Sequence, residues 1–293
     1  MRGKRSALRN RILVALAAIP VILLTVLERS TNGWPFLFVM LIAGLLCVME
    51  YMDLVGERFS RYSRTVSIVS TLSIIGFWYL YQYFTSSPLF IFNMAVVAFV
   101  VAFVPLVLLF LGVIFRDSFE GALQEVAFCY LPVLYIGIGF GSLIGIRGYA
   151  TDTGPYLVLY AFLVVWATDS FALIIGKLIG RHKLGLAVSP NKTGEGLAGG
   201  VFFALLTAVL FKIIGSSVYT GKLLFQWPVF LAVTLFLSLA DQIGDLAESV
   251  LKRSVGVKDS GGSIPGHGGW LDVFDAQLFV SPLFFALVVL LYR

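Results

Sequence analysis

This sequence of 293 residues carries little charge, since Asp, Glu, Lys and Arg together make up 13% of it. In soluble domains these four residue types make up about 25% of the sequence. Apolar residues make up 59% of the chain, more than the core of any soluble domain of this length needs. The composition therefore excludes an ordinary soluble enzyme and predicts an all-α, polytopic membrane protein, because helices satisfy their own backbone groups in lipid.

Cysteine and histidine are also scarce, with two residues of each. Cys47 and Cys129 both lie inside apolar runs, which indicates inert packing residues, and nothing in the sequence indicates a disulfide framework. Zinc sites are usually built from Cys and His. A site built here from carboxylates would favour a hard cation such as Mg²⁺.

Four further features are missing. No GxxxxGK[ST] motif occurs, so a Walker phosphate loop is excluded. We find no internal repeat and no low-complexity segment. The first apolar run, residues 12–27, is followed by Glu28-Arg29-Ser30 instead of a small-residue cleavage site, which indicates an anchor and not a cleavable signal.

Long apolar runs are abundant. A spanning helix needs about 20 largely apolar residues. By that measure the sequence predicts about nine transmembrane helices, at residues 10–27, 34–55, 65–84, 89–115, 127–146, 155–177, 197–218, 227–250 and 276–292. We divide the chain into N-terminal transmembrane helices, residues 1–150, and a C-terminal catalytic transmembrane region with cytoplasmic motif loops, residues 151–293.

The positive residues predict the orientation. The net charge of +5 does not indicate a nucleic-acid partner, because Lys and Arg fall in short loops between the apolar runs. With the N-terminus in the cytoplasm, 16 of the 21 Lys and Arg face the cytoplasm and four, Arg29, Arg147, Lys222 and Arg293, face outward. Lys212 lies inside a span, where it would snorkel or pair. The positive-inside rule therefore places the N-terminus inside and the C-terminus outside.

Acidic residues gather near the end of the eighth predicted helix. Asp241, Asp245 and Glu248 are spaced i, i+4 and i+7, which puts them on one helical face. An acid inside a membrane costs roughly 2.5–3.5 kcal/mol, so three cost on the order of 8–10 kcal/mol unless they face a wet cavity or a cation. We therefore expect a metal-lined cavity open to the cytoplasm. Asp169, in the sixth helix, either joins this cavity or makes an interhelical hydrogen bond.

The stretch from Ser249 to Asp275 follows these acids and is rich in Gly, Lys, Arg and Asp. Asp272 and Asp275, spaced i and i+3, share a face if the chain is helical there. Exposed backbone N–H groups and cationic side chains beside a hard cation suit phosphate binding. The alternative is a solvated loop between membrane helices.

A second polar stretch, residues 181–196, is a basic, glycine-punctuated loop. A basic loop of this kind can contact anionic lipid headgroups, and that interpretation stays open beside a role in a binding site. Glu50 and Asp53 close the second predicted helix, and their spacing indicates a solvated helix end, with a place at the border of the cavity as the alternative. His267, set among glycines, contacts either phosphate or the leaving group, or is structural.

The two stretches resemble motifs of a known family, the CDP-diacylglycerol synthases (phosphatidate cytidylyltransferases). The matching residues are Gly244-Asp245, Ser249-x-x-Lys252-Arg253, Lys258-Asp259, Pro265-Gly266-His267-Gly268-Gly269, Asp272-x-x-Asp275 and Ser189-Pro190-Asn191-Lys192-Thr193-Gly194-Glu195-Gly196. Three positions depart from the usual pattern: Val273 stands in place of Arg, Asn191 in place of Lys, and Trp270 in place of an aliphatic residue.

The resemblance implies transfer of CMP from CTP to phosphatidic acid at the cytoplasmic leaflet of a bacterial-type inner or plasma membrane. It implies catalytic roles for Asp245, Lys252, Arg253, Lys258, Asp259, His267, Asp272 and Asp275. It implies substrate binding by Asp169, Ser189, Lys192, Thr193, Glu195, Gly196, Gly268 and Gly269. Metal ligands would be Asp241, Asp245, Asp272 and Asp275.

The cofactor expected is Mg²⁺, and a second cation stays open. The expected partners are CTP, phosphatidic acid and membrane lipids, and a homodimer stays open. Two other functions stay open: a related CTP-dependent transferase or kinase for another membrane lipid, and an ion-coupled transporter, which also keeps intramembrane acids.

Overall fold

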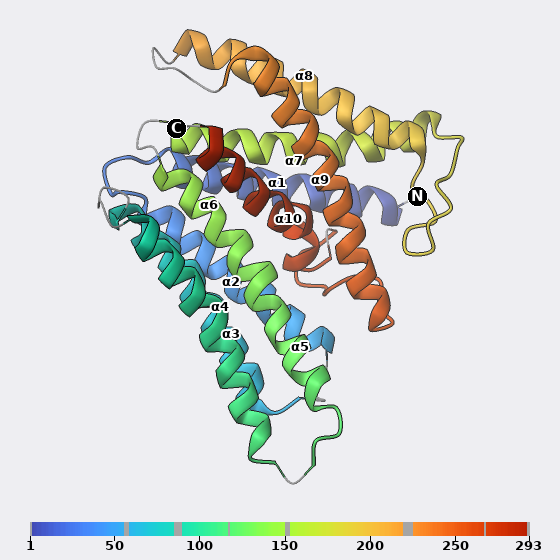
Figure 1. The fold of residues 1–293 in the computed structure, drawn as a ribbon. Coiled ribbons are helices and arrows are strands. Elements are labelled where there is room, and N and C mark those ends of the chain that lie inside the picture. The colour runs from blue at the N-terminus through green and yellow to red at the C-terminus, as the bar shows by residue number, and fades with distance from the viewer. Residues whose placement is uncertain are drawn as a thin grey trace. The chain divides into compact units, whose positions relative to one another are not determined.

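The computed structural model of this chain describes residues 2–55, 59–84, 90–116, 118–149, 153–218, 225–266 and 268–291; the side chains of residues 2–13, 15, 81–84, 90–100, 102 and 216–218 lie outside this description. The described residues form helices joined by loops, and their β-type pairing is limited to two isolated bridges. The helices are α1 (Arg2–Leu27), α2 (Trp34–Val55), α3 (Arg61–Phe84), α4 (Phe90–Ile114), α5 (Ala122–Pro132), the π-helix η1 (Val133–Gly137), α6 (Ile138–Tyr149), α7 (Gly154–Ile179), α8 (Gly194–Val218), α9 (Trp227–Ser254) and α10 (Trp270–Leu291) (Figure 1).

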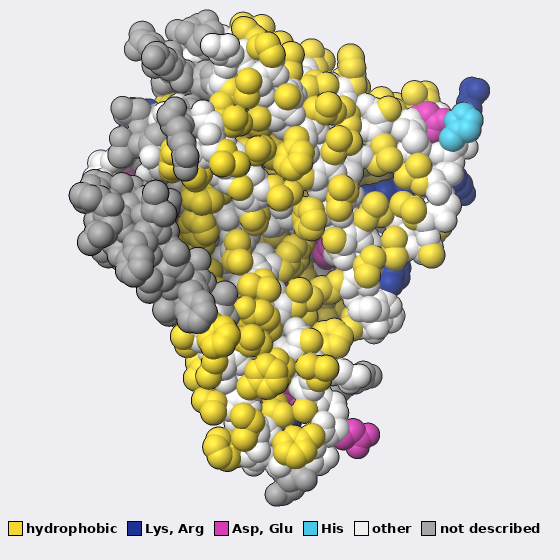
Figure 2. Space-filling model, viewed as in Figure 1, with side chains coloured by type: hydrophobic (Ala, Val, Ile, Leu, Met, Phe, Trp, Pro, Cys, Tyr) yellow, Lys and Arg dark blue, Asp and Glu magenta, His cyan; other side chains and the backbone are white. Residues whose placement is uncertain are grey.

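The predicted all-helical class is confirmed in the described residues, where helices occupy each of the nine predicted segments. Six helices there are long and apolar enough to cross a membrane: Trp34–Val55, Ala122–Tyr149, Gly154–Ile179, Gly194–Gly215, Trp227–Ser254 and Trp270–Leu291. Hydrophobic side chains dominate the face of the molecule shown in Figure 2. The chain is thus a multi-pass membrane protein, while the number nine and the orientation stay predictions.

The chain forms two compact units. The first contains Met1–Gly145 and, returning late in the sequence, Asp259–Val273; the second contains Ile146–Lys258 and Phe274–Arg293. The N-terminal helices and a segment of the C-terminal motif therefore belong to the same compact unit. The functional division at residue 150 stays a prediction.

A buried carboxylate joins three elements of the first unit. Glu125, in α5, accepts hydrogen bonds from the backbone N–H and Oγ of Ser60, which precedes α3. Arg116, just after α4, donates to both of its carboxylate oxygens at 2.6 Å. Apolar side chains of α4 and α5, Leu109, Val113, Val126 and Cys129, pack into a buried cluster in the same unit. This cluster agrees with the packing role predicted for Cys129.

Aromatic packing holds the second unit together. Tyr160 of α7 packs against Phe230 of α9 and Phe284 of α10, with ring centroids 5.1 and 5.5 Å away. Its hydroxyl lies 2.7 Å from Thr234 Oγ1, so the buried polar atom is satisfied. Lys212, in α8, is buried under Trp227 and Phe230 and donates to a backbone carbonyl, which explains how a cation is held inside a span.

Small residues bring α7 and α8 into close contact, and Figure 1 shows the two helices side by side. A Cβ on Gly196 would lie 2.9 Å from the carbonyl oxygen of Ala172 and 3.2 Å from the Cα of Gly176. One turn later, a Cβ on Gly200 would lie 2.9 Å from the carbonyl oxygen of Thr168. Glycine spaced at i and i+4 lets membrane helices approach at backbone distance. This contact sets the position of the loop that joins α7 to α8.

Candidate active site

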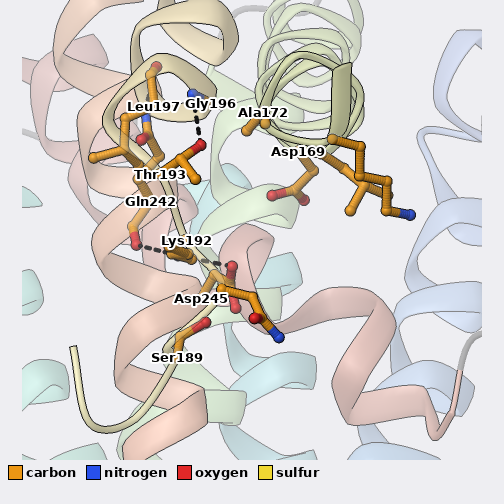
Figure 3. A pocket seen from close by; sticks show the side chains of 13 residues that line it. Asp169, Ala172, Ser189, Lys192, Thr193, Gly196, Leu197, Gln242 and Asp245 are labelled. Atoms are coloured by element: carbon orange, nitrogen blue, oxygen red, sulfur yellow. Dashed lines mark hydrogen bonds and ion pairs between the residues drawn. The ribbon is translucent and has the colours of Figure 1, made fainter. Parts of the chain in front are cut away.

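A cavity of about 300 Å³ opens in the second unit where the α7–α8 loop meets α9 (Figure 3). It contains residues of the polar stretch 181–196 and one of the acids of α9, Asp245. The lining residues are Asp169, Ala172, Leu173, Gly176, Lys177, Ser189, Asn191, Lys192, Thr193, Gly196, Leu197, Gln242 and Asp245.

The α7–α8 loop folds back on itself before α8 begins. Leu184 N–H donates to the carbonyl of Lys192 at 2.9 Å, and Gly194 N–H donates to the carbonyl of His182 at 2.9 Å. Thr193 then caps α8, because its Oγ1 accepts from the N–H of Gly196 at 3.2 Å. A rigid turn of this kind fixes the direction of the residue before the cap, Lys192.

Lys192 extends from this loop to α9. Its Nζ lies 2.9 Å from Asp245 Oδ2 and 3.4 Å from the backbone carbonyl of Gln242, as the dashed lines in Figure 3 show. The Asp245 side chain keeps 37% of its surface exposed. The pair therefore lies at the wall of the cavity, where each partner is accessible to a ligand.

More carboxylates surround this ion pair than it can neutralise. Asp169 faces the cavity from α7. Asp241 lies one turn before Asp245 on α9, and Asp169, Asp245 and Asp275 are all close enough to it to act on its charge. Asp241 is fully buried, and neither of its oxygens accepts a hydrogen bond from the described residues. Buried carboxylates in this state need a cation or protons.

Three basic residues follow on α9 and beyond it. Lys252 pairs with Glu248 one turn earlier on the helix, and the Glu248 side chain is completely buried. Arg253 donates to the carbonyl of Val257 at 3.2 Å, and its side chain is exposed. Lys258 is exposed as well. Of the three, Lys252 thus neutralises an acid of the protein, whereas Arg253 and Lys258 point to solvent.

The segment Asp259–Val273, in the first unit, leads into α10. Asp272 occupies the third position of that helix, and its Oδ2 accepts from the N–H of Gly269 at 2.7 Å and of Ser260 at 2.9 Å. This reach back to the residue before the helix is half of a capping box. Gly268 has φ +92°, where a Cβ would also contact the Asp272 carboxylate, so glycine is required there.

Residues 9–291 match the cytidylyltransferase family. The chain belongs to the cytidylyltransferase family. It is 35% identical to a phosphatidate cytidylyltransferase of Bacillus subtilis (strain 168) over 285 residues, 97% of this chain and 98% of that protein. It is 45% identical over 166 residues to one of Staphylococcus aureus (strain COL), which covers 57% of this chain and 60% of that protein. Over 167 residues it is 46% identical to one of Staphylococcus haemolyticus (strain JCSC1435), 57% of this chain and 60% of that protein.

In this cytidylyltransferase, the second unit brings together many of the predicted site residues. Six of them line the cavity, namely Asp169, Ser189, Lys192, Thr193, Gly196 and Asp245. Two more, Asp241 and Asp275, lie close to the acids of the cavity. The Glu195 carboxylate instead makes contacts within its own loop: it accepts from the N–H of His182 and lies 2.5 Å from His182 Nδ1. Asp259 is exposed at the start of the other unit's segment. His267 lies outside the described residues.

The structure also corrects one interpretation and adds a residue that the sequence analysis missed. Glu50 is not a solvated helix end, because it accepts hydrogen bonds from Ser263 and from the backbone of Leu271. Asp53, on the next turn, is exposed and pairs only loosely with Arg64, as expected of such an end. Gln242 lines the cavity, and its backbone carbonyl accepts from Lys192 Nζ. The sequence analysis missed this residue because a contact made by a backbone carbonyl leaves no pattern in the sequence.

The metal prediction stays a prediction. Among the described residues, no group of three or more His, Cys, Asp or Glu side chains is arranged to hold a metal ion. The donor chemistry nevertheless suits Mg²⁺, since the acids around the cavity are all carboxylates and both Asp241 oxygens accept no hydrogen bond from the described part of the chain.

Proposed function

We infer that this chain is a phosphatidate cytidylyltransferase, which transfers CMP from CTP to phosphatidate and releases pyrophosphate. The observation that carries this function is the 35% identity to the Bacillus subtilis phosphatidate cytidylyltransferase across 97% of this chain. The family resemblance seen in the motif residues is thereby confirmed. The cavity supplies the matching chemistry, a cation and several carboxylates beside a glycine-rich helix start.

The reaction is a substitution at phosphorus. A phosphate oxygen of phosphatidate forms a bond to the α-phosphorus of CTP, the bond to the β-phosphate oxygen breaks, and pyrophosphate leaves with the electron pair. The attacking phosphate is already anionic at neutral pH, so little general-base work is needed. Catalysis then rests on neutralising charge and aligning the reacting atoms.

The residues of the second unit support this division of work. Lys192 is positioned to hold phosphate oxygens, with Thr193 and Gly196 fixing its approach. We assign Lys252, Arg253 and Lys258 to triphosphate and lipid phosphate, of which Arg253 and Lys258 have exposed side chains ready to bind. Asp259, Asp272, Gly268 and Gly269 belong to the segment that precedes α10, and we keep them as proposed participants.

We propose that Mg²⁺ is held by Asp241, Asp245 and Asp275. Asp272 belongs to the other compact unit, and its role as a ligand stays a prediction from the sequence. Magnesium sites in phosphate chemistry commonly use one or two carboxylates, completed by water and substrate phosphates. When bound, the ion neutralises charge on the triphosphate and on the departing pyrophosphate. Asp245 would exchange its contact with Lys192 for this cation, which frees Lys192 for a phosphate.

A direct assay tests the function. Purified protein in detergent is incubated with CTP labelled in the cytidine ring, Mg²⁺ and phosphatidic acid, and both the labelled lipid and pyrophosphate are measured. We expect the two products in equal amounts. Release of CDP in place of pyrophosphate would identify a kinase, and labelled product formed only with another lipid phosphate would identify a transferase of different substrate. The ion-coupled transporter has no support comparable to the family membership.

We also propose that the active site faces the cytoplasm, on the basis of the 16-to-4 division of Lys and Arg. A tag placed after Arg293 should react with a membrane-impermeant reagent outside intact cells, and a tag before Met1 should not. The reverse labelling pattern would put both motif stretches on the side that lacks CTP and would refute this orientation.

A further inference from the structure

Glu50 of α2 is placed against a segment more than 200 residues away in the sequence. Its Oε1 accepts from Ser263 Oγ at 2.6 Å. Its Oε2 accepts from the N–H of Leu271 at 3.1 Å and from Ser260 Oγ at 3.4 Å. Both oxygens of one carboxylate are thus committed to the described part of the segment Asp259–Val273, within the same compact unit.

These contacts help to cap the N-terminus of α10. The first N–H groups of a helix have no partner inside the helix. Here Gly269 N–H donates to Asp272, Leu271 N–H donates to Glu50, and Asp272 N–H donates to Ser260 Oγ at 3.3 Å. Two of the three acceptors come from outside α10, so the start of this helix is defined by Glu50 and Ser260 as well as by its own side chain.

The backbone of the segment is shaped to fit this carboxylate. A Cβ on Gly261 would lie 3.0 Å from Glu50 Oε1, and a Cβ on Gly269 would collide with Glu50 Oε2 and Ser260 Oγ. Glycine at these two positions lets the chain lie directly on the Glu50 side chain. The contact is therefore a tight fit on both sides and not a chance approach of two polar surfaces.

We propose that Glu50 is a positioning residue of the transferase, one that seats the segment Asp259–Val273 so that Asp272 and the start of α10 hold their catalytic arrangement. This inference rests on the proposed function, because it takes Asp272 to work in the transfer reaction. Glu50 itself touches no reacting atom in this proposal. It acts through the helix start, as outer residues around active sites do when they orient the groups that bind.

The test compares Glu50→Ala and Glu50→Gln with Asp53→Asn, an acid one turn further along α2 whose side chain is 77% exposed. We measure kcat and KM for CTP per folded molecule, the melting temperature, and hydrogen exchange of residues 259–272. Loss of an orienting partner typically lowers activity by about 10- to 100-fold. We expect a fall of that size in kcat for Glu50→Ala, a smaller fall for Glu50→Gln, which keeps one acceptor oxygen, and none for Asp53→Asn. KM for CTP should change less than about threefold, because the proposed triphosphate contacts lie in the other unit.

Two results would overturn the proposal. One is a kcat per folded molecule for Glu50→Ala that stays within twofold of the unmodified protein. The other is unchanged hydrogen exchange at residues 259–272 in that variant. A lower melting temperature with normal kcat would show a purely structural contact and would also refute it. If the unmodified protein released no pyrophosphate, the proposed function would fail and the positioning role with it, whereas hydrogen exchange would still report whether Glu50 seats the segment.

A double variant sharpens the result. Ser263→Ala removes the hydroxyl that donates to Glu50 Oε1 while leaving the rest of the segment in place. If Glu50 acts through this contact, Ser263→Ala should have little further effect on kcat once Glu50→Ala is present. Fully multiplicative losses would show that the two residues act independently and would contradict the seating mechanism.

Discussion

The two compact units each bury a carboxylate in a membrane helix, and the two carboxylates are treated in opposite ways. Glu125, whose side chain is 5% exposed, accepts two hydrogen bonds from Ser60 and a bidentate pair from Arg116. Asp241, fully buried, accepts no hydrogen bond from the described residues and is surrounded by other acids. One acid is completely matched by its own chain, and the other is not.

The number of hydrogen bonds that a buried acid accepts distinguishes a structural acid from a functional one better than its burial does, because both acids are buried. A buried charge that is fully hydrogen-bonded holds elements together, and removing its partner is costly. A buried charge among like charges destabilises the fold, and such groups cluster at functional sites. By this criterion the Glu125 cluster is a clamp between α3, α4 and α5, and we propose that the acids around Asp241 form the site.

The largest effect is expected from the second group. Asp241→Asn and Asp245→Asn keep the shape of each side chain but remove a charge that the proposed cation needs. Turnover should fall at least about a hundredfold, in line with the removal of an electrostatic group at a reacting centre. The melting temperature of Asp241→Asn should not fall, because repulsion among the acids is relieved.

Steady-state rates and thermal melting of the same preparations check this prediction. Near-normal turnover in both variants would sink the assignment of the carboxylates to a metal. A large loss of thermal stability in Asp241→Asn would instead place Asp241 with Glu125, as a structural acid, and would break the comparison.

The next largest effect concerns the clamp. Glu125→Ala leaves Arg116 without its bidentate partner, and breaking such a pair costs 3–5 kcal/mol when it is fully buried. Arg116 keeps 29% of its side chain exposed, so we expect about 2 kcal/mol. Unfolding monitored in detergent should show this loss, and kcat per folded molecule should stay unchanged. A drop in kcat without a drop in stability would contradict the structural role.

The smallest effect is expected at the edge of the cavity. Asn191, exposed on the cavity wall, stands where the family usually has Lys. A charge-assisted contact to phosphate contributes roughly 1.5–3 kcal/mol when buried and less at an exposed position. Asn191→Lys should therefore lower KM for CTP by about three- to tenfold, with kcat nearly unchanged.

Arg181→Ala serves as the partner variant for that test. If Asn191→Lys leaves KM untouched and Arg181→Ala raises it steeply, another cation has already replaced the missing lysine. If neither variant alters KM, the α7–α8 loop does not bind the triphosphate, and its basic residues contact lipid headgroups instead.

Helices and the acidic face of α9 could be predicted from the sequence because both depend on local periodicity. The start of α10 was placed at residue 276 and lies at Trp270, because apolarity marks only the part of a helix that faces lipid. Gly269-x-x-Asp272, a capping pattern, was the available signal for the true start.

Contacts that depend on packing could not be predicted. Lys192 reaches Asp245 because glycines bring α7 and α8 together, and no local pattern states where a loop then points. Glu50 was misinterpreted because its partners lie 210 to 221 residues further along the chain. An acid at a helix end looks the same in sequence whether it faces water or receives another segment.

The return of Asp259–Val273 to the first unit has a consequence for the order in which the protein assembles. Chains are made from the N-terminus, and domains tend to fold as their residues emerge. Here α2 is complete some 200 residues before Ser263 and Leu271 are made. The Glu50 carboxylate therefore lacks these two hydrogen-bond donors while α3 to α9 are synthesised. The first unit can close only after nearly the whole chain has been made. A truncated product that stops before residue 259 would contain the N-terminal helices of that unit and still lack the segment that completes it.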